Sequence, residues 1–158
     1  MALSKDTLRK SRGEPRKISV AIGTAATLYV GSLVNRRTTT GRALAATAAT
    51  GRKFLGVVER LDGPNGESTG TGVGNTSGTQ KALIRYNDEF LVTIATAIRT
   101  NTSLGLDLFV SDDDKVAGTA VGTAGKRVPV GELVAFEASD KSTGWVRSRQ
   151  FSKANIAV

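Results

Sequence analysis

The residues of this chain that could do chemistry are carboxylates, hydroxyls and amines, because its 158 residues include no cysteine and no histidine. That composition excludes thiolate zinc sites, cysteine nucleophiles, Ser-His-Asp triads and imidazole metal ligands. The carboxylates of Asp88 and Glu89, and of Glu132 and Glu137, stand in no pattern that favours hydrolysis. We therefore expect no enzyme, with no catalytic residue, no cofactor and no metal.

Two glycine-containing segments approach the spacing of phosphate-binding loops without meeting it. A dinucleotide pattern beginning at Gly70 and Gly72 needs its third glycine where Asn75 stands, and no helical pattern follows. Beside Lys126, Arg127 replaces the hydroxyl residue that holds magnesium in a P-loop, and Ala120 replaces its first glycine. Both segments are interpreted as ordinary loops.

One acidic cluster is formed by Asp112, Asp113 and Asp114. Three carboxylates could hold calcium, but the glycine and the distal glutamate of an EF-hand loop are missing. Asx-rich turns between strands are a far commoner use of such residues. The sequence therefore predicts a turn here rather than a metal site.

Positive charge gathers at the amino terminus of a chain whose net charge is +8. Residues 1–17 carry six bases against two acids, and Gly13 and Pro15 prevent a helix from continuing to Ile18. A segment of this composition cannot bury enough apolar surface to fold by itself. It is either a frayed terminus or an arm that orders on a partner. In the second case the predicted contacts are Leu3, Lys5, Leu8, Arg9, Lys10, Arg12, Arg16 and Lys17.

A second basic region follows within residues 36–60, opposed only by Glu59. It is either a solvated face or a contact for an acidic protein surface. Nucleic-acid binding would favour interleaved aromatic side chains or a basic helix, which this region lacks, so direct nucleic-acid contact is not expected. The predicted contact residues of this face are Arg36, Arg37, Arg42, Arg52 and Lys53.

The hydrophobic pattern that must position these residues is typical of β structure. Short apolar or alternating runs, bounded by turn residues, predict strands. They lie at 18–22, 28–30, 33–34, 54–58, 82–86, 90–95, 104–110, 128–136 and 145–147. The alanine-rich segment 43–49 predicts one or two helical turns, and the Gly/Ser/Thr-rich segment 67–80 predicts a flexible exposed loop with almost nothing to pack. The expected core comprises Phe54, Leu55, Val57, Leu83, Ile84, Phe90, Val92, Ile94, Leu108, Val130, Leu133 and Phe136.

Three domain segments follow from this pattern: an extended basic arm at 1–17, one small β-barrel, β-tulip or sandwich-like body at 18–147, and a tail at 148–158. Within the body, Gly31, Gly51 and Gly56 recur as Gly105, Gly125 and Gly131, at offsets of 74, 74 and 75 positions. Such spacing is consistent with two similar β units, although small residues match by chance easily. No apolar stretch suited to a signal peptide or a transmembrane helix is visible, so we expect assembly in the cytoplasm.

Several segments of the body resemble the head decoration, or cement, proteins of tailed bacteriophages. The resemblance spans about residues 18–147. The segments that carry it are LYVG (28–31), KFLGVV (53–58), GNTSG (74–78), FLVTIA (90–95) and LFVSDD (108–113).

This resemblance implies a structural virion protein with a β-barrel or β-tulip body on the outer surface of an icosahedral capsid. It also implies that the protein clamps adjacent capsomers, binds the major capsid protein and itself, as a homotrimer, and has no membrane partner. The basic arm lies outside the resemblance. Two alternatives remain open: a basic β-barrel that binds nucleic acid, and another virion component of the neck or tail.

Overall fold

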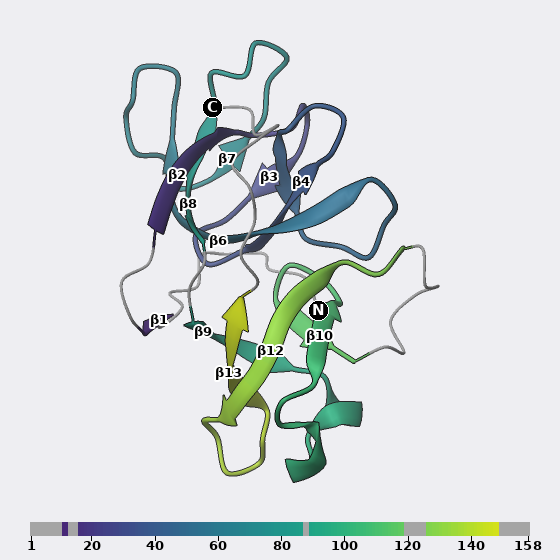
Figure 1. Ribbon diagram of the computed structural model, residues 1–158. Coiled ribbons are helices and arrows are strands. Elements are labelled where there is room, and N and C mark those ends of the chain that lie inside the picture. The colour runs from purple at the N-terminus through teal and green to yellow at the C-terminus, as the bar shows by residue number, and fades with distance from the viewer. Residues whose placement is uncertain (1–10, 13–15, 87–88, 119–125, 149–158) are drawn as a thin grey trace.

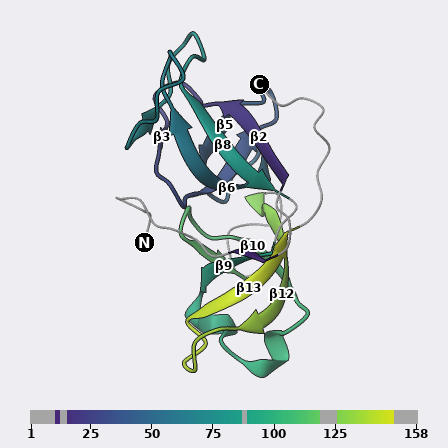
Figure 2. The ribbon, with the colours of Figure 1, turned by 90° about the vertical axis from the view of Figure 1, so that its left-hand side faces the viewer.

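The computed structural model describes residues 11–12, 16–86, 89–118 and 126–148 of the chain, and in them the protein is mostly β (Figure 1). The prediction of a mostly β fold with a barrel is confirmed. The described residues form one closed five-stranded barrel and a second five-stranded sheet whose edges meet at a single bridge, which we also call a barrel, and the two lie one above the other in Figures 1 and 2. Helical structure among the described residues is limited to 3₁₀ turns, of which η1 (Thr96–Ile98) and η2 (Asn101–Ser103) lie wholly within them.

The first barrel is an antiparallel sheet in the order β2-β8-β6-β4-β5. A parallel bridge between Ile22 and Ala43 joins its two edges. Beside it, β3 and β7 form a two-stranded ribbon. The bounds are β2 (Arg16–Ala21), β3 (Thr27–Leu28), β4 (Leu33–Arg37), β5 (Ala43–Ala45), β6 (Arg52–Asp62), β7 (Gly72–Val73) and β8 (Lys81–Tyr86).

The second barrel has the order β9-β11-β10-β12-β13 and is closed by pairing between β13 and β9. The short strand β1 (Ser11–Arg12) adds to β9, with Ser11 opposite Phe90. The bounds are β9 (Glu89–Ile94), β10 (Asp107–Val110), β11 (Lys115–Ala117), β12 (Pro129–Phe136) and β13 (Thr143–Ser148).

The two barrels have the same topology and register. In the first, Leu33 lies opposite Val57 and a bulge follows Val34. In the second, Asp107 lies opposite Glu132 and the bulge follows Leu108. The parallel bridge between Ile22 and Ala43 recurs as Ile94 opposite Val116. The described residues therefore contain two equivalent β units, which agrees with the glycine offsets in the sequence.

Two pairs of recurring glycines have the same structural role in the two barrels. A Cβ added at Gly56 would overlap the carbonyl oxygen of Arg85, and one added at Gly131 would overlap that of Arg147. Gly31 and Gly105 both adopt positive φ, at 89° and 83°, a conformation that side chains with a Cβ rarely allow. Close strand approach and a left-handed turn explain why glycine recurs at these positions.

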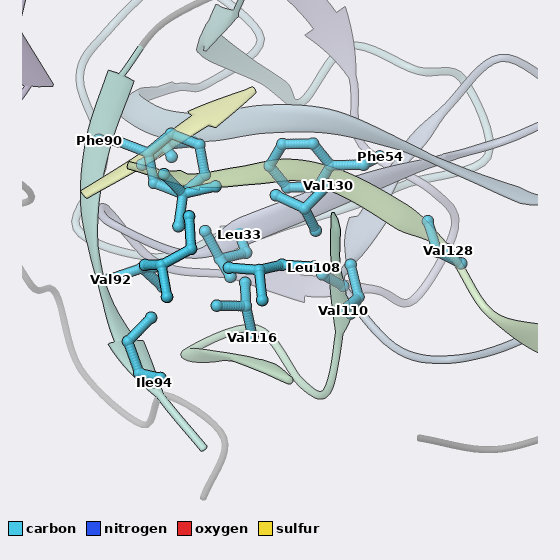
Figure 3. Packing of buried hydrophobic residues seen from close by; sticks show 14 residues of the cluster. Leu33, Phe54, Phe90, Val92, Ile94, Leu108, Val110, Val116, Val128 and Val130 are labelled. Carbon is cyan, nitrogen blue, oxygen red and sulfur yellow. The ribbon is translucent and has the colours of Figure 1, made fainter. Parts of the chain in front are cut away.

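The hydrophobic interiors of the barrels are unequal. The first encloses its own cluster around Val20, Ile22 and Leu61. The cluster of the second also takes in side chains from the outer face of the first barrel (Figure 3). Phe54 stacks on Phe90 with their ring centroids 5.9 Å apart. The two barrels therefore share one core, which the outer face of the first barrel completes with Leu33, Ala46, Phe54 and Val57.

Several local predictions are wrong. Residues 43–49 are not helical, because Ala43 and its neighbours pair with β4 as strand β5 and Ala43 is buried in the first barrel. The strand predicted at 28–30 already ends at Leu28, as β3. The strand predicted at 54–58 continues past Val58 to Asp62, as β6, because a bulge keeps it paired with β8.

Segment 67–80 is also not the unpacked loop that its composition predicts. It contains β7, and Gly72 and Gly74 are buried. A Cβ at Gly72 would meet the side chains of Ile22 and Leu61. Within the predicted core, Leu83 and Phe136 are only partly buried, whereas the other predicted core residues are buried.

The glycines at the strand crossings provide one test of the duplicated fold. Gly56→Ala and Gly131→Ala should each destabilise the protein by about 1–3 kcal/mol or more, because the backbone must shift to admit the methyl group. Gly70→Ala is the control, since nothing lies within 4 Å of its added Cβ. Urea unfolding measures all three, and equal midpoints would contradict the close strand approach.

The shared core provides a second test. Phe90→Ala should lower the free energy of unfolding by about 3–5 kcal/mol, because the buried ring stacks on Phe54. Phe136→Ala should cost clearly less, because this ring is only partly buried. Thermal unfolding of the two variants checks the difference, and a loss of similar size in both would count against the shared core.

Candidate functional site

Basic residues converge on one end of the first barrel, formed by the β4–β5 hairpin and the start of β6. On the paired strands, Arg36 lies opposite Lys53, and Arg37 lies opposite Arg52. Arg42 lies in the same hairpin, two residues beyond Thr40 and directly before β5. We call Arg36, Arg37, Arg42, Arg52 and Lys53 the basic end. The structure thus places all five predicted residues at one end of the barrel, but Arg36 is buried, so they do not form a single exposed face.

The charges on the basic end repel one another. Like charges directly opposite on paired strands are destabilising. Partial burial and the nearby Arg37 guanidinium both lower the pKa of Arg52, and burial is the larger cause.

Within the described part of the chain, no carboxylate pairs with the side chains of Arg37, Arg52 or Lys53. Other exposed bases do have such partners. Lys17 Nζ lies 2.6 Å from Glu59 Oε1, and Arg60 Nε lies 2.7 Å from Asp62 Oδ1. Arg37, Arg52 and Lys53 therefore carry positive charge that no described carboxylate offsets.

A cavity of about 440 Å³ adjoins the basic end. Guanidinium groups and hydroxyls line it and would suit a carboxylate or another oxyanion. Its lining residues are Gly23, Thr24, Arg37, Thr40, Arg42, Leu44 and Thr76.

Arg42 has a structural role that the sequence did not indicate. Its guanidinium donates hydrogen bonds to Thr24 Oγ1 at 3.1 Å, to the carbonyl oxygen of Asn75 at 2.9 Å and to that of Thr76 at 2.8 Å. The Asn75 side chain in turn donates to Thr79 Oγ1 at 2.7 Å and accepts from the Thr79 backbone N–H. Arg42 therefore holds segment 67–80 against the barrel, and only part of its donor capacity faces the cavity.

The predicted arm is placed only in part. Leu3, Lys5, Leu8, Arg9 and Lys10 lie outside the described residues. The backbone of Arg12 belongs to β1.

Arg16 and Lys17 correct the arm's boundary, because they begin β2 and pair with Tyr86 and Arg85 of β8. The pairing between β2 and β8 therefore begins two residues before Ile18. The sequence did not indicate this, because both residues are charged. The arm therefore ends before Arg16.

The acidic cluster forms a turn, as the sequence predicts. Asp112 Oδ1 accepts the Asp114 backbone N–H at 2.9 Å, which makes an Asx turn between β10 and β11. The Asp113 carbonyl accepts the Leu33 backbone N–H at 2.8 Å, so this turn contacts the first barrel. Among the described residues, no group of three acidic residues could hold a metal ion. No helix in that part of the chain is long and apolar enough to cross a membrane.

Comparison with known proteins finds no family model, no curated protein and no solved structure that matches this chain.

The hydrogen bonds of Arg42 yield a third prediction. Arg42→Ala should release residues 74–79, because it removes the two hydrogen bonds donated to the carbonyl oxygens of Asn75 and Thr76, and those from charged donors contribute about 1.5–3 kcal/mol each at most. Hydrogen exchange should become faster in this segment while the barrel core stays protected. Arg37→Ala is the matched control and should leave exchange in residues 74–79 unchanged. Equal exchange in both variants would show that Arg42 does not anchor the segment.

Proposed function

We propose that this chain is a structural virion protein that binds the outer surface of a tailed-phage capsid and stabilises adjacent capsomers, with the basic end as a protein contact. The observation that carries the proposal is the excess positive charge of Arg37, Arg52 and Lys53, which no described carboxylate compensates. The resemblance of residues 18–147 to head decoration proteins supplies the class of partner.

The fold suits a protein that binds repeatedly over a symmetric surface. Two barrels that share a core present a fixed surface, so little conformational entropy is lost when the surface binds. Repetition of a modest contact over a symmetric shell gives high avidity without a large interface for each copy. Exposed like charges raise the rate of encounter with an acidic surface and make binding sensitive to salt.

Nucleic-acid binding is less well supported by the basic end. A single-strand binder stacks bases on exposed aromatic side chains. The aromatic residue nearest in sequence to Lys53 is Phe54, and its ring is buried against Phe90 in the shared core. The basic end therefore offers charge without a stacking platform.

Cosedimentation with capsids tests the proposal. The full-length protein should sediment with expanded capsids assembled from the major capsid protein of the same genome. Deleting residues 2–12 should weaken binding several-fold and reduce its dependence on salt, because four of the chain's bases are lost. Arg60→Ser is the control, because it removes one exposed charge that already pairs with Asp62.

Two outcomes would contradict this proposal. One is a wild-type protein that stays in the supernatant at low salt. The other is a wild-type protein that binds duplex DNA with steep salt dependence while ignoring capsids, which would favour the nucleic-acid alternative.

A further inference from the structure

The cavity beside the basic end carries positive charge and hydrogen-bond donors but no acidic residue. Among the residues that line it are two arginines, Arg37 and Arg42, three threonines and one large apolar residue, Leu44. Neither arginine has a carboxylate partner within the described part of the chain. The wall of the cavity therefore holds two positive charges that no described carboxylate neutralises.

Three arginines lie in a row across neighbouring strands at this cavity, and Arg37 is the middle one. Across the β4–β5 hairpin, the Arg37 backbone N–H donates to the Arg42 carbonyl oxygen at 2.9 Å. On its other side, Arg37 lies opposite Arg52 of β6. Residues directly opposite each other on antiparallel strands have their side chains on the same face of the sheet. Arg52 therefore adds a third positive charge next to Arg37.

Arg42 is held in place while part of its guanidinium stays available. Its Nη1 donates to Thr24 Oγ1 and to the Asn75 carbonyl oxygen, and its Nη2 donates to the Thr76 carbonyl oxygen. A guanidinium has five N–H donors, so the Nε–H and one further N–H have no acceptor among the described residues. Because the three acceptors are neutral, they fix the group without cancelling its charge. Little side-chain freedom then remains to be lost on binding.

The threonine hydroxyls at the cavity are also available as donors. Thr24 Oγ1 accepts from Arg42 Nη1, and Thr40 Oγ1 accepts from the Arg42 backbone N–H at 3.3 Å. A hydroxyl that accepts a hydrogen bond keeps its own O–H to donate. Neither O–H meets an acceptor in the described part of the chain. The polar side chains around the cavity thus offer mainly donors, which favours a ligand that only accepts.

We propose that this cavity binds the ionised carboxylate of an acidic side chain on the protein partner, and that Arg37 clamps it. An ionised carboxylate accepts hydrogen bonds and donates none. Arginine can hold such a group through two parallel N–H···O bonds. The proposal rests on the function proposed above, because it names the chemical group that the basic end recognises on its partner.

A nucleic-acid phosphate shares this acceptor chemistry but uses less of the cavity. The described residues that line the cavity include no aromatic side chain on which a base could stack. They do include Leu44, which forms an apolar wall against which the methylene groups of a glutamate can pack. An acidic side chain therefore engages both the charged and the apolar parts of the cavity.

Nuclear magnetic resonance titration of the full-length protein at low salt tests the proposal. The probe is a peptide blocked at both ends that contains two adjacent glutamates between glycines. It should shift the Nε–H signals of Arg37 and Arg42 saturably, at millimolar peptide, because a single charge-assisted contact is weak. The same peptide with glutamine in place of both glutamates should leave these signals unchanged.

Substitutions at Arg37 show whether its guanidinium holds the carboxylate. Arg37→Gln should weaken peptide binding at least tenfold, because it removes the charge and the paired donors. Arg37→Lys should weaken it several-fold, because lysine keeps the charge but has no planar pair of donors. Arg60→Gln is the matched control and should have no effect, since Arg60 already pairs with Asp62. Circular dichroism and the melting temperature establish that each variant is folded.

Two further titrations identify the source of the bound group. Succinate carries two carboxylates without a peptide backbone and should bind no more tightly than the glutamate peptide. If succinate binds tenfold more tightly, the ligand is a small free carboxylate and the protein partner is wrong. A single-stranded deoxythymidine octamer that shifts the same signals at tenfold lower concentration than the peptide would overturn the proposal in favour of nucleic acid.

The same measurements separate this proposal from the proposed function. If the wild type sediments with capsids but the glutamate peptide does not bind, or binds equally well to Arg37→Gln, the carboxylate site is wrong and the capsid function stands. If the peptide binds through Arg37 while no protein sediments with capsids, the site stands and the capsid function is wrong. If both hold, Arg37→Gln should also weaken sedimentation several-fold, and unchanged sedimentation would overturn the assignment of the partner.

Discussion

The packing of Phe54 on Phe90 is the contact on which the arrangement of the molecule depends. The second barrel has an apolar end that its own strands do not cover, and the outer face of the first barrel covers it. This requirement fixes the relative placement of the barrels. The contact uses the outer face of the first barrel and the end of the second barrel. The outer face of the second barrel and the end of the first barrel are therefore not part of it. The basic end is one of those remaining surfaces, so its location follows from the shared core.

The sequence allowed much of the β structure to be predicted, because alternation and turn residues are local signals. Ile18, Val20 and Ile22 alternate along β2, and strand β9 matches its predicted range closely. The glycine offsets also carried information, because Gly56 and Gly131 are required by the same close strand crossing. The five basic residues at 36–53 could be grouped because β4 and β6 pair residues that lie near one another in sequence.

Other features depend on contacts that local patterns do not encode. Ala43 is a good helix former, but a small side chain also fits the interior of a narrow barrel, and packing overrides propensity there. Gly72 and Gly74 looked like linker residues, although the absence of a side chain is what lets β7 approach Ile22 and the backbone of Gly23. The role of Arg42 depends on carbonyl groups more than thirty residues away. Nothing local could indicate those partners.

Strand β1 has a consequence for the order of events during synthesis. Ser11 and Arg12 are among the first described residues to leave the ribosome, but their partners on β9 are Phe90 and Glu89. Chains emerge at about 5–20 residues per second, and domains commonly begin to fold as they emerge. Strand β9 follows β8 almost directly, so β1 gains its partner about 0.4–1.6 s after the first barrel is complete, whereas β13, which closes the second barrel, emerges about 3–12 s after it. During that interval its outer face, with Leu33, Phe54 and Val57, stays open to solvent. The nascent chain is most exposed to aggregation after β8 is complete and before β9 to β13 have closed beneath it.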